Sequence, residues 1–196
     1  EDEANVTRPF GWRLTWPPND DGDRMITLAR AEPGHLPAFK RELQDAFGAA
    51  VIETFGPLTD GPIPSDEDIE ESFAAPGTVI LEILREGQRI GGAVLTIDEE
   101  TQENELGFFF IKVGEEGRGL GLEAWRAIEA MFPETRVWVT HTPYFEKRNI
   151  HFYLNKCGFK IVEFTHGDHR DPEMPELGEV PGGDEMFRFE KVMPAR

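Results

Sequence analysis

Cysteine is nearly missing from this 196-residue chain, which contains only Cys157. A single cysteine excludes an internal disulfide framework and is typical of proteins kept in a reducing compartment. Long apolar runs are missing as well, because none approaches the roughly 18 residues that a membrane-spanning helix needs. The acidic first residues, Glu1-Asp2-Glu3, do not resemble a signal peptide. We therefore expect a soluble cytoplasmic protein with no membrane partner.

Basic residues are scarce, with 20 Lys and Arg against 38 Asp and Glu, for a net charge of −18. This balance disfavours nucleic acid and anionic membranes as partners, because both require clustered Lys and Arg side chains. It is compatible with a cationic substrate such as an amine. Acidity also serves solubility in many proteins, and we favour that simpler explanation of the composition as a whole.

The most informative stretch runs over residues 108–132, FFFIKVGEEGRGLGLEAWRAIEAMF. An apolar run predicts a buried strand over Phe108–Ile111, four glycines follow, and an amphipathic helix then continues to Pro133. Glycines allow the backbone to approach a ligand closely, and a helix start directs free N–H groups at an anion. The stretch therefore predicts a phosphate or pyrophosphate site. Neither the P-loop pattern nor the Rossmann pattern G-x-G-x-x-G matches it.

The segment Glu116-Gly117-Arg118-Gly119-Leu120-Gly121 resembles the loop Q/R-x-x-G-x-G/A of the GNAT superfamily of acyl-CoA N-acetyltransferases. In that family the loop carries the pyrophosphate of coenzyme A. A second segment, Asn149 to Phe159, is similar to the family's closing motif of an Asn, a Phe-Tyr pair and Gly-Phe. The two motifs in this order imply an acetyltransferase that uses acetyl-CoA as co-substrate.

The pattern of elements predicts an α/β (α+β) fold, a mixed and largely antiparallel central sheet with helices on both faces, as the resemblance also implies. Residues 1–23 are an N-terminal extension with a short edge strand as one option, and 24–196 form a single acetyltransferase domain. Ser65 and Asp68 approximate a capping box, and Gly91-Gly92 suggests a bulge or a close backbone approach. Strands are expected over 25–31, 79–85, 89–98, 108–111, 136–140, 159–164 and 186–192, and helices from about 35, after 65, over 120–132 and over 147–157.

Cofactor-binding residues follow from the loop and from the resemblance. The backbone N–H groups from Gly117 to Gly121 are the candidate pyrophosphate cradle, and the side chain of Arg118 adds positive charge. The resemblance implies that the preceding strand pairs with the pantetheine arm and that a residue of the later helix contacts the cofactor. Asn149 is the candidate for that contact, although it could instead cap its helix. The remaining cofactor-binding candidates are Phe110, Ile111, Val113, Gly117, Gly119, Leu120 and Gly121.

One position departs from the family pattern, because Glu116 stands where the family has Gln or Arg. A carboxylate there would repel a pyrophosphate. This departure favours an alternative function, a non-catalytic acyl-CoA-binding or sensing module. A nucleotide ligand other than coenzyme A is a further alternative.

Acetyl transfer requires an acid for the leaving thiolate and a base for the amine. Tyr153 is similar to the family's general acid, but four residues separate it from Gly158 where the family has three. The alternative is that Tyr153 packs on the sheet. Glu105 is the first candidate base and His141 the second, although each could be an ordinary solvated side chain. No metal site is predicted, because His166, His169 and the nearby acids lack a defined ligand geometry.

We therefore expect an N-acetyltransferase that transfers an acetyl group to a primary amine of a small molecule or peptide by direct attack. The resemblance implies that the acceptor lies between the Gly56–Ala75 and Thr165–Asp184 regions. Both regions are acidic, which hints at a cationic amine. The sequence leaves a homodimer open.

Overall fold

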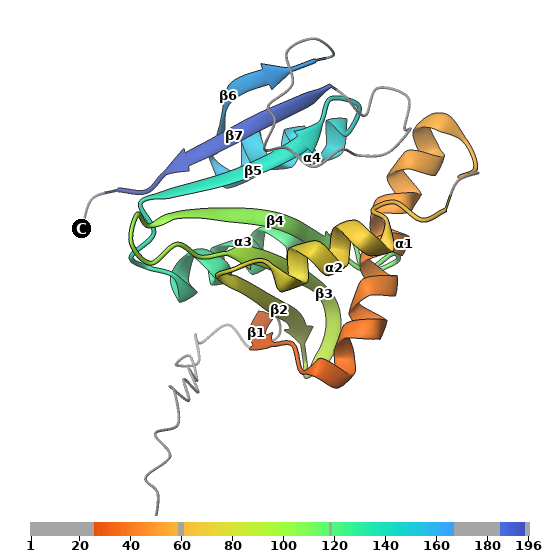
Figure 1. Cartoon of the computed structure of the whole chain (residues 1–196), viewed down its shortest axis with the longest axis horizontal. Coiled ribbons are helices and arrows are strands. Elements are labelled where there is room, and N and C mark those ends of the chain that lie inside the picture. Colours follow the sequence, from red (N-terminus) through yellow and green to blue (C-terminus); the bar gives the residue numbers. More distant parts are fainter. Residues whose placement is uncertain (1–25, 59–60, 118, 167–184, 195–196) are drawn as a thin grey trace, which may run out of the picture.

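A seven-stranded sheet in the order β1-β2-β3-β4-β5-β7-β6 forms the centre of the molecule (Figure 1). The computed structural model describes residues 26–58, 61–117, 119–166 and 185–194, so the predicted extension, Arg118 and most of the Thr165–Asp184 loop lie outside the described residues. The strands are β1 (Ile26–Arg30), β2 (Thr78–Arg85), β3 (Gln88–Thr96), β4 (Glu103–Ile111), β5 (Val137–Pro143), β6 (Lys160–Thr165) and β7 (Met186–Val192).

Helices cover both faces of this sheet, as the sequence predicts. The short turn η1 (Pro33–His35) leads into α1 (Leu36–Phe55), which lies with α2 (Asp66–Ala74) in front of the sheet in Figure 1. The opposite face carries α3 (Leu120–Met131), α4 (Lys147–Phe152) and the π-helical turn η2 (Tyr153–Cys157). None of the helices in the described residues is long and apolar enough to cross a membrane.

Apolar side chains explain this two-sided arrangement. The stripe of α1 buries Phe39 and Leu43 with Ile69 of α2 against Val94 and Phe110 of the sheet. On the other face a second cluster joins α3 and η2 to the strands through Trp125, Ile128, Trp138, Tyr153, Cys157 and Phe189. Burial raises the pKa of the Cys157 thiol to about 12. Cys157 is therefore a neutral core residue, as expected from its place beside Gly158.

Two local predictions on the α1 face are confirmed. The Ser65 side chain accepts a hydrogen bond from the Asp68 N–H while the Asp68 carboxylate accepts one from the Ser65 N–H, which completes a capping box at the start of α2. At Gly92 a side chain would overlap the ring of Phe39, so α1 approaches the strand backbone directly. The register of β2 and β3 shifts beside Gly91, as predicted for a bulge.

The central pair β4–β5 is the only parallel pair among the described strands, and it is short. Glu103–Leu106 pairs with Val137–Thr140, after which the two strands diverge while β4 continues to Ile111 and β5 to Pro143. Figure 1 shows this divergence from the left of the view toward the right. We call the point of divergence, at Leu106 and Thr140, the fork. Beyond the fork, the edge of β4 that faces β5 has no strand partner in the described residues.

A β-bulge at Gly107 changes which way β4 faces just after the fork. Val94 of β3 lies opposite Phe108 and Leu95 lies opposite Leu106, so Gly107 is the extra residue. After the bulge, Phe108 and Phe110 contact Phe47 and Phe39 of α1, with ring centroids 5.7 Å and 5.2 Å apart. Phe109 instead stacks on Phe152 of α4, at 5.9 Å. The bulge thus reverses the alternation of β4, so Phe108 and Phe110 face α1 instead of sharing the face of Leu106, while Phe109 faces α4.

Candidate active site

The fork is closed at its apex by a chain of hydroxyl groups. The Thr140 Oγ1 donates a hydrogen bond of 2.8 Å to the carbonyl oxygen of Leu106, across the last β4–β5 pair. The Tyr153 hydroxyl interacts with the Thr140 side chain, and this interaction opposes the rise in the phenol pKa that burial causes. The phenol therefore lies beside the fork.

Tyr153 itself lies within the core, since only 6% of it is exposed. Its ring contacts those of Phe159 and Phe189, with centroids 5.5 Å and 5.7 Å away. Burial raises the pKa of the phenol above its usual value, which keeps the hydroxyl protonated at neutral pH. The alternative that Tyr153 packs on the sheet is thus what the structure shows. Its role as the acid remains a prediction, and one that a neutral donor at the fork can fulfil.

The irregular spacing between Tyr153 and Gly158 has a structural counterpart in η2. Residues 153–157 form a π-helical turn, and the Phe159 N–H donates to the Tyr153 carbonyl oxygen at 3.0 Å. A π turn takes up one more residue than an α turn, so it accommodates the extra residue of the motif without displacing Gly158. The predicted helix over 147–157 is therefore α-helical only as far as Phe152.

Asn149 lies half-buried one turn before Tyr153 in α4. The alternative that Asn149 caps its helix is wrong, because α4 begins at Lys147 and Glu146 is the N-cap residue. Contact with the cofactor remains the prediction for Asn149.

The two candidate bases form a single pair. His141 Nδ1 lies 3.4 Å from Glu105 Oε1, joining β5 to β4 at the fork. The sequence places His141 after its strand, whereas the structure includes it in β5, which extends to Pro143 through its pairing with β7. Pairing places Arg188 of β7 opposite His141. A carboxylate that orients an imidazole is an arrangement suited to proton abstraction.

The glycine loop after β4 has the backbone geometry that the sequence predicts. Gly114, Gly117 and Gly119 have φ values of +90°, +93° and +79°, which side chains disfavour. Gly119 is the N-cap residue of α3, and the Leu120 N–H donates to the Gly117 carbonyl oxygen at 3.2 Å, so the free N–H groups of the first turn begin at Gly121. Binding of an anion by this loop remains a prediction.

Glu116 already uses one donor of this loop. Its Oε2 accepts a hydrogen bond of 2.6 Å from the N–H of Gly114. Nearby, Lys112 Nζ lies 3.1 Å from the Glu42 Oε1 of α1. The carboxylate of Glu116 thus occupies a position where the loop would offer a donor to a phosphate. The position at which this sequence departs from the family pattern therefore affects the cradle itself.

The predicted pantetheine-binding residues follow the fork along β4. Phe110 and Ile111 lie on the part of the strand that β5 no longer pairs, and Val113 is 58% exposed just beyond it. A free strand edge can hydrogen-bond an extended amide-containing ligand through its backbone groups. Binding of the pantetheine arm along this edge remains a prediction.

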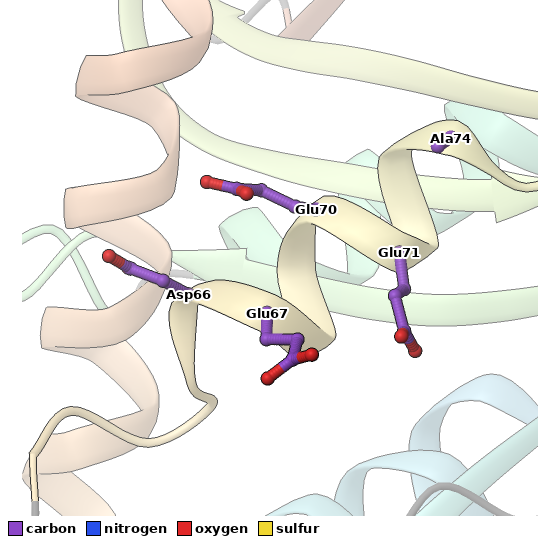
Figure 2. Close-up of a pocket in the computed structure, with 5 residues that line it drawn as sticks. All are labelled: Asp66, Glu67, Glu70, Glu71 and Ala74. Carbon is purple, nitrogen blue, oxygen red and sulfur yellow. The ribbon is translucent and has the colours of Figure 1, made fainter.

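An acidic groove lies along α2, within the region predicted for the acceptor (Figure 2). Its volume is about 610 Å³, and its lining residues are Asp66, Glu67, Glu70, Glu71 and Ala74. Figure 2 shows Asp66 and Glu70 pointing toward α1, where Lys40 Nζ lies 3.3 Å and 2.7 Å from their carboxylates. Glu67 and Glu71 point away from α1. The groove therefore has two carboxylates that α1 does not neutralise.

Sequence reasoning missed one residue, Glu146, between β5 and α4. It is 8% exposed and lies two helical turns before Tyr153. No local pattern marks it, because an acidic residue before a helix is usually a solvated cap. Only its burial distinguishes it.

A sheet that forks at a central parallel pair, followed by a glycine loop at a helix start, is the arrangement that the resemblance to acyl-CoA N-acetyltransferases implies. The chain belongs to the acetyltransferase (GNAT) family, because the model of that family matches residues 37–159, more than half of the chain. It is 50% identical over 173 residues to the uncharacterized protein YrkN of Bacillus subtilis, covering 86% of this chain and 94% of YrkN.

Solved structures with low sequence identity share the fold. An acetyltransferase of Bacillus subtilis in complex with CoA is 19% identical, with a TM-score of 0.60 over 88% of this chain and 100% of that one. A spermidine N-acetyltransferase of Vibrio cholerae, in complex with CoA and spermine, is 15% identical, with a TM-score of 0.60 over 85% and 95%. The predicted fold and family are confirmed, and so is acetyl-CoA as the co-substrate at the level of the family.

Proposed function

We propose that this protein is an acetyl-CoA-dependent N-acetyltransferase that acts on a primary amine of a small molecule or peptide. The observation that carries the proposal is the fork. It brings a neutral phenol, a Glu–His pair and an unpaired strand edge to one place, in a chain of the acetyltransferase (GNAT) family. These are the acid, the base and the cofactor-binding surface that amine acetylation requires.

Acetyl-CoA supplies an activated acyl group, a thioester that an uncharged amine can attack. The backbone of β4 from Phe110 to Val113 and the glycine loop up to Gly121 hold it in an extended form. Asn149 on α4 adds a side-chain contact. Arg118, outside the described residues, adds charge to the pyrophosphate site. Together these contacts position the thioester at the fork.

The residues at the fork move the two protons of the reaction. His141, oriented by Glu105, takes one proton from the attacking amine, whose nitrogen forms the new bond to the acetyl carbon. The carbon–sulfur bond breaks, and the sulfur receives the phenol proton of Tyr153. Proton return to Tyr153 from His141, through solvent, restores both groups. The products are an N-acetylated amine and free coenzyme A, so atoms and charge balance.

A cationic acceptor is the substrate class that the surface supports best. Glu67 and Glu71 of α2 point away from Lys40 and remain available to a positively charged ligand. The spermidine N-acetyltransferase of similar fold was solved with spermine, a polycation. Carboxylates attract such ligands over several ångströms, and salt weakens that attraction.

The test of the function is a calorimetric titration with acetyl-CoA, free CoA and NADH, followed by amine-dependent release of free thiol. Saturable binding of the two CoA compounds alone, with thiol release that requires an amine, is the expected result. Binding without thiol release to any amine would favour a non-catalytic acyl-CoA-binding or sensing module, for which the Glu116–Gly114 contact is the specific observation. Absence of binding would overturn both.

A matched pair of variants locates the cofactor site. Gly119→Glu should abolish acetyl-CoA binding, because it places a bulky negative charge at the start of α3. Gly87→Glu is the control: Gly87 has a nearly identical φ, +78° against +79°, and no backbone atom near its Cβ position, as at Gly119, but it lies in the β2–β3 hairpin. Equal effects of the two substitutions would mean that the glycine loop does not bind the cofactor.

A further inference from the structure

Glu146 is a buried carboxylate whose charge has no direct partner. Within residues 26–58, 61–117, 119–166 and 185–194, no hydrogen bond or ion pair reaches its side chain. It is the N-cap residue of α4, yet its carboxylate does not accept a hydrogen bond from the helix it precedes. An N-cap acid normally does so, because this satisfies free N–H groups at no cost in burial. The residue is instead 8% exposed, and its carboxylate oxygens have no internal bond among the described residues but still reach solvent.

The direction of the pKa shift of Glu146 agrees with a buried carboxylate that lacks a partner. Burial raises the pKa of the Glu146 carboxyl, and the charge of Arg148 opposes this shift while that of Glu53 adds to it. A carboxylate so placed is costly to ionise. A positive charge in contact with the Glu146 carboxylate would remove this cost.

Packing shows where such a charge would lie. Phe145, next to Glu146, packs edge-to-face on Phe55 at the end of α1, with ring centroids 4.9 Å apart. This contact brings the β5–α4 turn against α1, and Glu53 is the exposed carboxylate on that side. Glu146 and Glu53 therefore face a common region between α1 and α4.

The helical spacing relates this region to the fork. Glu146 and Tyr153 are seven residues apart, so they lie on one face of the helix, about 10 Å apart along its axis. The charge of Glu146 also contributes to the raised pKa of Tyr153, which places the two groups within electrostatic range. A ligand at Glu146 would thus be close to the fork but not at its apex.

We propose that Glu146, with Glu53 near the end of α1, binds a second positively charged group of the acceptor, so that the substrate is a diamine or a longer polyamine. This inference rests on the proposed N-acetyltransferase function. One amino group of such a substrate reaches His141 and the thioester at the fork. The other remains protonated and supplies the charge that Glu146 lacks.

The experiment compares two probes that differ by one amino group, 1,4-diaminobutane and 1-aminobutane, by acetyl-CoA-dependent thiol release. We expect the wild-type protein to prefer the diamine. Glu146→Gln should raise KM for the diamine about tenfold or more, because it removes the charge of a buried pair. It should leave the constants for 1-aminobutane and the Kd of acetyl-CoA unchanged. Glu134→Gln, which removes an exposed charge before the opposite end of β5, is the control.

The remaining outcomes overturn the inference in distinguishable ways. A weaker Kd for acetyl-CoA in Glu146→Gln would make Glu146 a cofactor contact. An equal fall in kcat for both amines would make it part of proton transfer. Thiol release with other amines but not with 1,4-diaminobutane would reject a diamine substrate while leaving the acetyltransferase function intact. No acetyl-CoA binding in the wild type would instead reject the function itself.

Discussion

Two buried glutamates, Glu82 and Glu146, have nearly the same exposure, 6% and 8%, but opposite surroundings. Glu82 on β2 accepts a hydrogen bond of 2.6 Å from the Arg89 Nη1, and the His35 Nδ1 lies 3.1 Å away. Glu146 has no such partner among the described residues. Burial alone therefore does not distinguish a structural carboxylate from a functional one.

The region of Glu82 is electrostatically complete. Arg89 bridges to α1 as well, through two hydrogen bonds of 2.8 Å and 3.1 Å to the Glu42 carboxylate. Lys112 at the end of β4 also contacts Glu42. This network fastens α1 to the β2–β3 hairpin and leaves nothing for a ligand to satisfy. The comparison teaches that a missing internal partner, rather than burial, indicates a ligand site.

The largest expected effect is on stability and comes from removing Arg89, the cation that Glu82 and Glu42 share. Arg89→Met should lower the free energy of unfolding by about 3 kcal/mol, because it removes the cation that Glu42 and Glu82 share in a mostly buried place. Urea unfolding would measure it. Lys40→Met, which removes exposed ion pairs on the same helix, should change stability little. A loss as small for Arg89 as for Lys40 would show that the network does not stabilise the fold.

The second prediction concerns the fork, where we expect activity to fall more than stability. Tyr153→Phe removes the proton donor but keeps the ring contacts, so turnover should fall by about a hundredfold. Stability should fall by only about 1 kcal/mol for the lost hydroxyl and its interaction with Thr140. Thiol release at saturating acetyl-CoA and calorimetric binding would separate the two effects. Unchanged turnover would show that Tyr153 is a core residue only.

Features that depend on local sequence could be predicted in advance. Ser65 and Asp68 form a capping box whenever a helix starts there, and Gly117 and Gly119 permit a tight loop in any fold. The family motifs then supplied the sheet topology. Strand limits were accurate for β7 and too short for β5, since the end of β5 depends on pairing with β7 rather than on its own residues.

Features that depend on tertiary contacts could not be predicted. Glu105 and His141 were separate candidates because the register of a parallel pair 30 or more residues apart leaves no local pattern. The extra residue after Tyr153 was visible in the sequence, but not that a π turn would absorb it. Glu146 was missed because the lack of a partner for its carboxylate depends on tertiary packing and leaves no pattern in the local sequence.

A smaller effect, on acetyl-CoA binding, is expected at Glu116. Unlike Glu146, Glu116 accepts a hydrogen bond, and its donor is a backbone N–H that the cofactor would also use. Glu116→Gln should tighten acetyl-CoA binding several-fold, because the amide lacks the charge that competes with the pyrophosphate at Gly114. Glu115→Gln removes the neighbouring charge and serves as the control for general electrostatics. Calorimetric titration at two salt concentrations would measure both. Weaker binding in Glu116→Gln would mean that this contact organises the loop instead of obstructing it.

The smallest expected effect tests the cost of burying Glu146 without any substrate. A carboxyl whose pKa is raised by folding contributes full stability below its unfolded pKa and loses it as the pH rises through the folded value. Glu146→Gln cannot ionise, so at pH 7–8 it should melt about 2–4 °C above the wild type. The difference should disappear as the pH falls well below about 4, because the wild-type carboxyl is then protonated in both states. Thermal unfolding across this pH range, with Glu134→Gln as the exposed control, would measure it. A Glu146→Gln variant less stable than the wild type at pH 7–8 would mean that the carboxylate already has a partner, and that it resembles Glu82 after all.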